Sequence, residues 1–492
     1  MEPRPAAALA ALVGAKLCFP GPEDAAEPCW RDSAGARLVG PDVVIDSREA
    51  TPGSLFVALP GERADGHDFI AAAARSGAAA ALVRRPVAGA GLVQLVVSDP
   101  LAALAALARG LVAEARGHLL VIGLTGSSGK TTTKDILSQV LAQAAPTVAP
   151  AGSFNNEIGV PLTAARIGRS TRYLVSELGA RGPGHITALC GIVNPEIGLV
   201  LNVGAAHAGE FGSPAATAAA KGELVDCLPA DGWAVLNADD PLVAALASRH
   251  LGPTAWFSHD RPASLRGQRA VWASAVEADA GQRHAFRLHD SACPGGSWPV
   301  RLRFPGPHQV ANALAAAAAA LAAGLAPEAV AVGLSAAEPL SRWRLEIRRR
   351  NDGLTVINDA YNANPDSMRV ALATAAGLWR ARRREQPKAR LVAVLGDMLE
   401  LGPEAEAQHG EVGRLAAASG VSRLVAVGAW APVLAAAAAA AGAEARPVGN
   451  RDAAVSQLDD LGPADIVLVK ASRGVGLEAV ACALLAEKDG PC

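Results

Sequence analysis

A glycine-rich stretch, "GLTGSSGKTTTKD" (123–135), carries the residue types of a phosphate-binding loop. It follows an apolar run (118–124) and opens a segment whose apolar residues recur at helical spacing (130–144). A buried strand, a glycine loop and a helix in this order form the context that such a loop requires. The alternative is an ordinary Gly/Ser turn with an exposed lysine.

Each residue type in the stretch has a defined use. Gly126 and Gly129 let backbone N–H groups face a triphosphate at the N-terminus of the following helix, where the helix dipole favours anions. Lys130 can reach the β- and γ-phosphates, and the hydroxyl of Thr131 can hold Mg²⁺. The sequence therefore predicts a nucleotide site.

Polar residues also follow apolar runs further along the chain. Glu177 ends "LVSE", and His207 stands in "LNVGAAHAGEFGS". Ligands of an open parallel sheet gather beyond the carboxyl ends of its strands, so both residues are predicted to meet Thr131 there. A carboxylate and an imidazole beside a phosphate loop indicate metal ligation. A structural histidine is the alternative for His207.

The residues alone do not decide the roles of two further motifs. Lys221, in "AAAKGELV", is either a solvated helix residue or part of the site. Asn155 and Asn156, in "SFNNEIGVPLT", either serve a substrate or make a turn.

Composition excludes several classes of protein. The 45 Lys plus Arg and 47 Asp plus Glu of the 492 residues nearly balance, so we expect no nucleic-acid partner. Runs such as "ANALAAAAAALAAGLA" predict packed helices and no membrane insertion, because Ala is barely hydrophobic. The seven cysteines form no C-x-x-C pair, which indicates reduced thiols. Glu2 and Lys16 argue against a signal peptide, and the N-terminus is expected to begin a cytoplasmic domain.

Together the motifs resemble the Mur ligases, ATP-dependent enzymes that add amino acids to the peptidoglycan precursor. Leu124, where the generic phosphate loop has glycine, is what that family shows. The stretch "IDSREATPGSLFVALPG" (45–61) is similar to their N-terminal domain, which holds the UDP-sugar substrate. "HQVANALAAAAA" (308–319) is similar to their adenine-side segment. The central motifs that carry the resemblance are T-G-S-S-G-K-T-T (125–132), N-N-E-I-G (155–159), H-x-G-E-F-G-S (207–213) and K-G-E-L (221–224).

The resemblance implies an α/β fold in three domains. Residues 1–114 would form a small N-terminal substrate domain, and residues 115–338 a central P-loop ATPase domain with a parallel sheet. Residues 339–492 would form a Rossmann-like C-terminal domain that binds the incoming dipeptide and completes the nucleotide site. Strands are expected at 55–59, 80–83, 92–98, 118–124, 172–178, 197–203, 233–238, 354–361, 390–397, 423–428 and 465–472.

Three motifs of the last third resemble the family member that adds D-alanyl-D-alanine: "INDAYNANPDSM" (357–368), "VLGDMLELG" (394–402) and "LVKASRGVGLE" (468–478). This implies a ligase that joins D-Ala-D-Ala to UDP-MurNAc-tripeptide through an acyl phosphate, using ATP and Mg²⁺, as a cytoplasmic monomer. The sister that adds the third amino acid (lysine or diaminopimelate) carries Y-A-H-x-P and D-N-P-R motifs that this chain lacks. That sister, a P-loop nucleotide switch and an inactive relative are the alternatives.

The resemblance also implies catalytic roles for three residues. Lys130 would neutralise the triphosphate together with Mg²⁺ held by Thr131 and Glu177. His207 would hold a second Mg²⁺. Lys221 would be carbamylated by CO₂ and become a carboxylate-like metal ligand, which needs a neutral, partly desolvated lysine.

Further roles follow for nucleotide and substrate. Asn312 would bind adenine, Arg342 the phosphates and Asp359 the ribose hydroxyls. Arg342 as a solvated linker charge, and turn chemistry for the substrate residues, are the alternatives. The phosphate cradle would be Gly126, Ser127, Ser128, Gly129, Lys130, Thr131 and Thr132. The substrate residues would be Ser47 and Arg48 at the uracil or its phosphates, Asn155 and Asn156, and Asn362 and Asn364 near the dipeptide.

Overall fold

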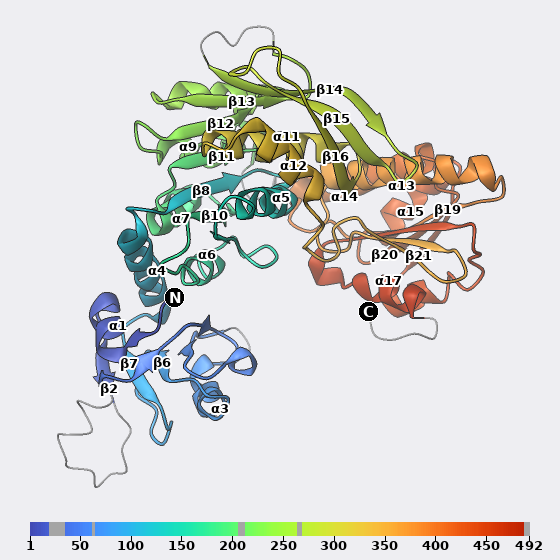
Figure 1. Ribbon diagram of the computed structural model, residues 1–492. Coiled ribbons are helices and arrows are strands. Elements are labelled where there is room, and N and C mark those ends of the chain that lie inside the picture. Colours follow the sequence, from blue (N-terminus) through green and yellow to red (C-terminus); the bar gives the residue numbers. More distant parts are fainter. Residues whose placement is uncertain (19–34, 62–63, 205–211, 263–267, 487–492) are drawn as a thin grey trace.

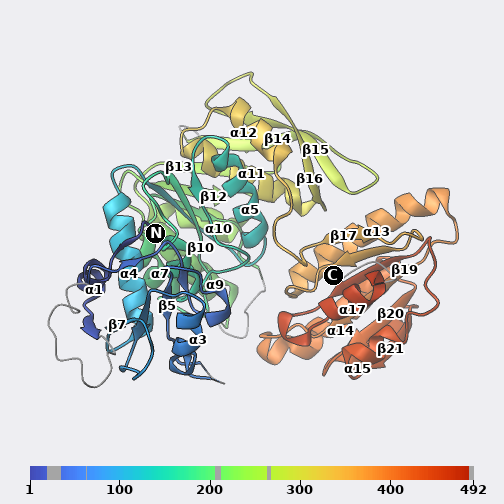
Figure 2. The ribbon, with the colours of Figure 1, turned by 60° about the horizontal axis from the view of Figure 1, so that its bottom comes forward.

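The computed structural model describes residues 1–18, 35–61, 64–204, 212–262 and 268–486. Within these residues the chain forms three larger sheets, of five, nine and six strands, and one two-stranded ribbon. Each larger sheet is built from a consecutive part of the chain, and the three parts form separate lobes (Figures 1 and 2).

The N-terminal sheet has the order β2-β7-β6-β5-β4, in which only β2 runs antiparallel to its neighbour. Its apolar strands are β4 (Val43–Val44), β5 (Leu55–Val57), β6 (Ala80–Val83), β7 (Val93–Val96) and β2 (Lys16–Cys18). The helices of this part are α1 (Ala6–Val13), α3 (Ile70–Arg75) and α4 (Pro100–Ala115), and β1 (Arg4–Pro5) pairs with β3 (Leu38–Val39).

Helix α4 connects this part to the next. Leu104, Leu107 and Leu111 pack into the core of the N-terminal sheet. Ala108 and Val112, on the adjacent helix face, pack into a core of the central part. Asp99 accepts hydrogen bonds from Leu101 N and Ala102 N and caps the helix. One helix with apolar residues on two faces thereby joins the two lobes.

The central sheet has the order β16-β15-β14-β13-β12-β11-β8-β10-β9 and is parallel from β9 to β14. Its strands are β8 (Leu120–Thr125), β9 (Thr147–Val148), β10 (Tyr173–Glu177), β11 (Ile197–Val200), β12 (Trp233–Asn237), β13 (Thr254–Ser258), β14 (Arg269–Ala278), β15 (Arg283–Asp290) and β16 (Trp298–Pro305). Strands β14 to β16 continue the sheet as antiparallel hairpins.

Helices cover both faces of the central sheet. One face carries α5 (Lys130–Ala142), α11 (His308–Ala322) and α12 (Pro327–Ala336). The other carries α4, α6 (Gly159–Ala164), α7 (His185–Val193), α9 (Pro214–Asp226) and α10 (Pro241–Ala244). The alanine run of α11 is fully buried from Ala313 to Ala320, because alanine allows the helix to approach the sheet and α5 closely. No helix in the described ranges is long and apolar enough to cross a membrane.

The C-terminal sheet has the order β17-β18-β22-β19-β20-β21, parallel except for the edge strand β17. Its strands are β17 (Glu346–Arg349), β18 (Thr355–Asn358), β19 (Leu391–Gly396), β20 (Arg423–Val427), β21 (Glu444–Val448) and β22 (Ile466–Lys470). Helices α13 (Pro365–Glu385), α14 (Ala405–Ala418) and α15 (Ala431–Ala440) cover one face, and α16 (Arg451–Val455) and α17 (Glu478–Leu485) the other.

The expected α/β class is confirmed, and each expected apolar run contains a strand. The expected strands do not include the short strands β1 to β4 and β9, nor β13 to β17 and β21. Strands β15 and β16 largely alternate buried with more exposed residues, so they lack the continuous apolar runs of the buried parallel strands.

We predict that Ala316→Leu destabilises the protein by about 1–3 kcal/mol, because the fully buried site has no room for three further carbons. The measurement is denaturant unfolding, with Ala436→Leu on the exposed face of α15 as the control. Equal midpoints for the two variants would contradict close packing of α11.

Candidate functional site

The phosphate-binding stretch begins at the carboxyl end of β8, in the middle of a parallel sheet. Strand β8 pairs with β10 on one side and β11 on the other, so Glu177 lies beside Leu124 and Val200 beside Thr125. This register brings the loop, Glu177 and the residues after β11 to one edge of the sheet, as the sequence predicted for Glu177.

Two glycines of the loop leave no space for a side chain. Gly129 has φ 78° and a Cβ there would lie 2.5 Å from Asn312 Oδ1. A Cβ on Gly126 would lie 2.8 Å from Leu201 Cβ. The loop can therefore turn into α5 only with glycine at these positions.

A cavity of about 950 Å³ opens over this edge and reaches the C-terminal lobe. It brings together most of the residues predicted for the site. Those that line it are Ser127, Ser128, Gly129, Lys130, Thr131, Thr132, Asn155, Asn156, Glu177, Lys221, Asn312, Asp359, Asn362 and Asn364.

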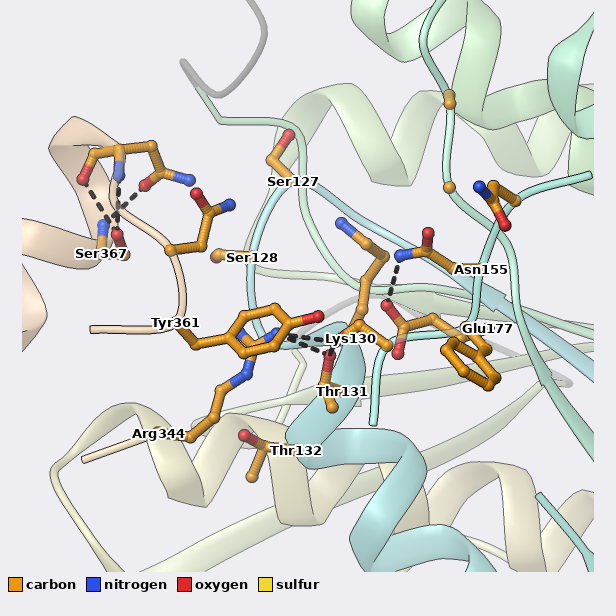
Figure 3. A pocket seen from close by; sticks show the side chains of 18 of the residues that line it. Ser127, Ser128, Lys130, Thr131, Thr132, Asn155, Glu177, Arg344, Tyr361 and Ser367 are labelled. Carbon is orange, nitrogen blue, oxygen red and sulfur yellow. Dashed lines mark hydrogen bonds between the residues drawn. The ribbon is translucent and has the colours of Figure 1, made fainter. Parts of the chain in front are cut away.

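Oxygen atoms suited to a hard cation meet on one wall of the cavity. Glu177 is 1% exposed; its Oε1 accepts a hydrogen bond of 2.8 Å from Asn155 Nδ2, while Oε2 has no partner among the described residues (Figure 3). The hydroxyl of Thr131 lies 2.7 Å from that of Ser153. No three His, Cys, Asp or Glu side chains gather as a metal site within the described ranges, and His207 lies outside them.

Two lysines line the cavity beside these oxygens. Lys130 Nζ donates to Gly126 O at 2.6 Å, and burial lowers its pKa against the opposing effect of the Glu177 charge. Lys221, on α9, is 2% exposed and lines the same cavity. Burial, assisted by the charge of Lys130, lowers the pKa of Lys221 to about 7.

The arginine at the phosphate loop is Arg344, and the prediction of Arg342 for this place is wrong. Arg342 lines a separate small pocket beside β17 and α17. Arg344 Nη2 lies 2.9 Å from Thr131 Oγ1 and 2.9 Å from Ser153 Oγ, and its guanidinium stacks on the ring of Tyr361 (Figure 3). No sequence signal distinguished the two arginines, which stand two positions apart in "SRWRLEI".

Asn202 is a second residue that the sequence analysis missed. Its Oδ1 accepts from Ser127 N at 3.0 Å and Ser128 N at 2.9 Å, and its Nδ2 donates to Ser128 O at 3.2 Å. The side chain thus shapes the loop from the end of β11. The sequence contains an indication of this role, because Asn202 closely follows an apolar strand and Glu177 ends one.

Several predicted residues lie in the cavity wall with their side chains already engaged. Asn156 Oδ1 accepts from Gly159 N, and Asn312 Nδ2 donates to Gln309 Oε1. Asn364 caps α13 in a capping box with Ser367. For Asn156 the contact is that of the turn alternative, whereas the contact of Asn364 is a helix cap.

Besides Arg342, three predicted residues of the described ranges do not line the cavity. Gly126 lies behind the loop against Leu201. Ser47 and Arg48 form a short 3₁₀ turn on the surface, where Arg48 pairs with Asp46 and holds the pKa of Asp46 at about 2. Of that turn's neighbours, Ile45 reaches the cavity.

Three family descriptions match consecutive parts of the chain. The Mur ligase family catalytic domain matches residues 42–111, the Mur ligase middle domain residues 124–320, and the Mur ligase glutamate ligase domain residues 343–473.

Curated relatives share nearly the whole length. The UDP-N-acetylmuramoyl-tripeptide–D-alanyl-D-alanine ligase of Mycobacterium tuberculosis is 45% identical, over 98% of this chain and 97% of the relative. The ligase of the same name from Escherichia coli is 36% identical, over 93% and 96%.

Solved structures agree. Crystal structure I of MurF from Acinetobacter baumannii matches with a TM-score of 0.80 and 32% identity, over 99% of this chain and 100% of that one. MurF ligase from Thermotoga maritima in complex with ADP matches with a TM-score of 0.71 and 26% identity, over 89% and 96%. The phosphate loop and the strand-end carboxylate are accompanied by similarity along the full length of the chain. The chain therefore belongs to the Mur ligase family.

Proposed function

We propose that the protein is a cytoplasmic ATP-dependent ligase that joins D-alanyl-D-alanine to UDP-MurNAc-tripeptide, giving UDP-MurNAc-pentapeptide, ADP and phosphate. The observation that carries the proposal is the single cavity in which the phosphate loop, the buried Glu177 and Lys221, and the loop after β18 meet. The relatives named for this reaction support the choice of substrates.

The reaction needs an activated carboxylate, because a free carboxylate would have to expel oxide. Transfer of the γ-phosphoryl group gives an acyl phosphate, whose leaving group is phosphate. The amine of the dipeptide then attacks the acyl carbon, and the tetrahedral intermediate collapses with loss of phosphate. Two anions must approach each other in the first step, so cationic groups are needed on either side of the transferred group.

Lys130 and Arg344 supply two of these cations. Lys130 stands at the start of α5, where the helix dipole adds to its charge. Arg344 approaches the same loop from the C-terminal lobe and is 2.9 Å from the hydroxyl of Thr131. A phosphoryl group between them would be held in line for attack and shielded from water.

The residues present fit a divalent cation. Thr131 and Glu177 would hold Mg²⁺ with hydroxyl and carboxylate oxygens, which is consistent with the unpartnered Oε2 of Glu177 within the described residues. Bound there, Mg²⁺ would supply positive charge to the phosphate oxygens. Lys221, once carbamylated, would add a carboxylate-like oxygen ligand on the same wall, and His207 is proposed for a second ion.

The acceptor is proposed to bind on the C-terminal side of the cavity. Asn362 and Tyr361 line that side, as does Asn364 at the start of α13. The UDP-sugar peptide would enter from the N-terminal lobe, where Ile45 faces the cavity, and extend past Asn155.

The test is phosphate release from ATP with UDP-MurNAc-tripeptide and varied acceptors. We expect phosphate release with D-Ala-D-Ala and a product heavier by the mass of the dipeptide less one water, and no release with lysine or diaminopimelate. Turnover of a UDP-MurNAc-dipeptide with a single amino acid would move the assignment to the sister ligase. Release that depends on no acceptor would overturn the ligase proposal.

The proposed carbamate on Lys221 makes a pH-dependent prediction. With a pKa of about 7, the reactive neutral amine grows from about a tenth to about nine tenths of the protein between about pH 6 and pH 8. At constant dissolved ¹³CO₂ we therefore expect the protein-bound carbamate signal in ¹³C NMR to rise over this range.

Controls separate this lysine from others. Lys221→Ala should lose both the signal and activity, and short carboxylic acids should restore part of the activity by replacing the lost oxygen ligand. Lys388→Ala, at an exposed lysine, should change neither. A signal that persists in Lys221→Ala, or failure of every carboxylic acid to restore activity, would count against the carbamate.

A further inference from the structure

Arg344 reaches the phosphate loop from a constrained segment of backbone. Its two neighbours, Trp343 and Leu345, have φ values of 58° and 49°, in the left-handed region that residues with side chains rarely adopt. Such a conformation persists only where surrounding contacts hold it. We name residues 343–345 the arginine arm.

The contacts that hold the arginine arm come from the loop after β18. Leu345 N donates to Asp359 Oδ1 at 3.0 Å, and Tyr361 N donates to Trp343 O at 3.2 Å. The Tyr361 ring lies under the guanidinium of Arg344, with 4.2 Å from Cζ to the ring centroid (Figure 3). Backbone and side chain of the arm are thus both fixed by one short loop.

Asp359 is held in turn by Lys470. Strands β18 and β22 are parallel neighbours, with Asn358 beside Val469, so the two residues that follow meet at the carboxyl edge of the sheet. Lys470 Nζ donates to Asp359 Oδ2 at 2.6 Å and to Asn362 O at 2.7 Å. Lys470 is 2% exposed and Asp359 9%, so this is a desolvated ion pair with further hydrogen bonds.

These contacts form a continuous chain from β22 to the phosphate loop. Lys470 binds one oxygen of Asp359, the other oxygen binds the backbone of the arginine arm, and Arg344 binds Thr131. We propose that Asp359 and Lys470 are positioning residues that hold Arg344 in place against the bound triphosphate. The identity of that nucleotide rests on the proposed function. Asp359 thereby acts through the arm and not only through the ribose expected from the sequence.

The charges around Lys470 fit this role. Arg344 and His308 also face it, and burial lowers the pKa of Lys470 while Asp359 opposes that change. Burial also lowers the pKa of His308 to about 3, so His308 adds no charge of its own at neutral pH. Asp359 thus binds Lys470 with one oxygen and the backbone of the arm with the other, and the geometry of the arm depends on the pair.

The experiment is a double-mutant cycle on binding of a non-hydrolysable ATP analogue with Mg²⁺, measured by calorimetry without the other substrates. Arg344→Ala and Lys470→Met should each raise the Kd about tenfold, since each removes one charged contact or its support. The double variant should raise the Kd by no more than Arg344→Ala alone, because Lys470 acts through Arg344. Lys470→Arg keeps a cationic donor for Asp359 and should restore most of the affinity, and Lys388→Met is the surface control.

Two results would overturn the proposal. One is a double variant whose loss is the product of the single losses, about 100-fold, which would mean that the residues act independently. The other is an unchanged Kd for Lys470→Met with a lowered melting temperature, which would make the lysine structural only. If Lys470→Met does not fold, Lys470→Gln, which keeps an N–H donor, takes its place, and its Kd is compared alone and together with Arg344→Ala.

Because the cycle needs only nucleotide binding, it is separable from the ligation assay. A protein that binds the analogue with the predicted coupling but joins no dipeptide would retain the positioning roles and lose the proposed reaction. A wild-type protein that binds no analogue would overturn both.

Discussion

The structure depends on placing positive charge where two anions have to meet. Lys130 and Arg344 lie around one cavity beside Lys221. Burial and the charge of Arg344 lower the pKa of Lys130 against the opposing charge of Glu177, and burial and the charge of Lys130 lower the pKa of Lys221 to about 7. Such a cluster is unfavourable without ligands, because desolvation and mutual repulsion both oppose it. A triphosphate and a carboxylate would relieve both costs, so the same feature that destabilises the empty cavity favours the bound substrates.

The fold supplies this cluster from separate parts of the chain. The central parallel sheet fixes Lys130 and Glu177 at adjacent strand ends, and α9 presents Lys221 on the same wall. The C-terminal sheet contributes Arg344 through an arm whose shape its own loop determines. Chemistry in the cavity therefore depends on the relative placement of two lobes.

The sequence predicted those features that follow from strand order and backbone sterics. Glycine at 126 and 129, and Glu177 beside the loop, are consequences of a parallel βαβ sheet, which the apolar runs indicate directly. It could not select Arg344 over Arg342, since the choice depends on positive φ values at Trp343 and Leu345 that only tertiary contacts impose. Ser47 and Arg48, predicted at the uracil or its phosphates, lie outside the cavity, and Arg48 pairs there with Asp46.

The most direct measurement follows an oxygen atom. UDP-MurNAc-tripeptide labelled with ¹⁸O in its reacting carboxylate would be converted with ATP and D-Ala-D-Ala, and the released phosphate examined by mass spectrometry. Phosphorylation of the carboxylate predicts one labelled oxygen in each phosphate, because the leaving group carries the former carboxylate oxygen. Unlabelled phosphate would contradict the acyl-phosphate route, and with it the role assigned to the cationic cavity.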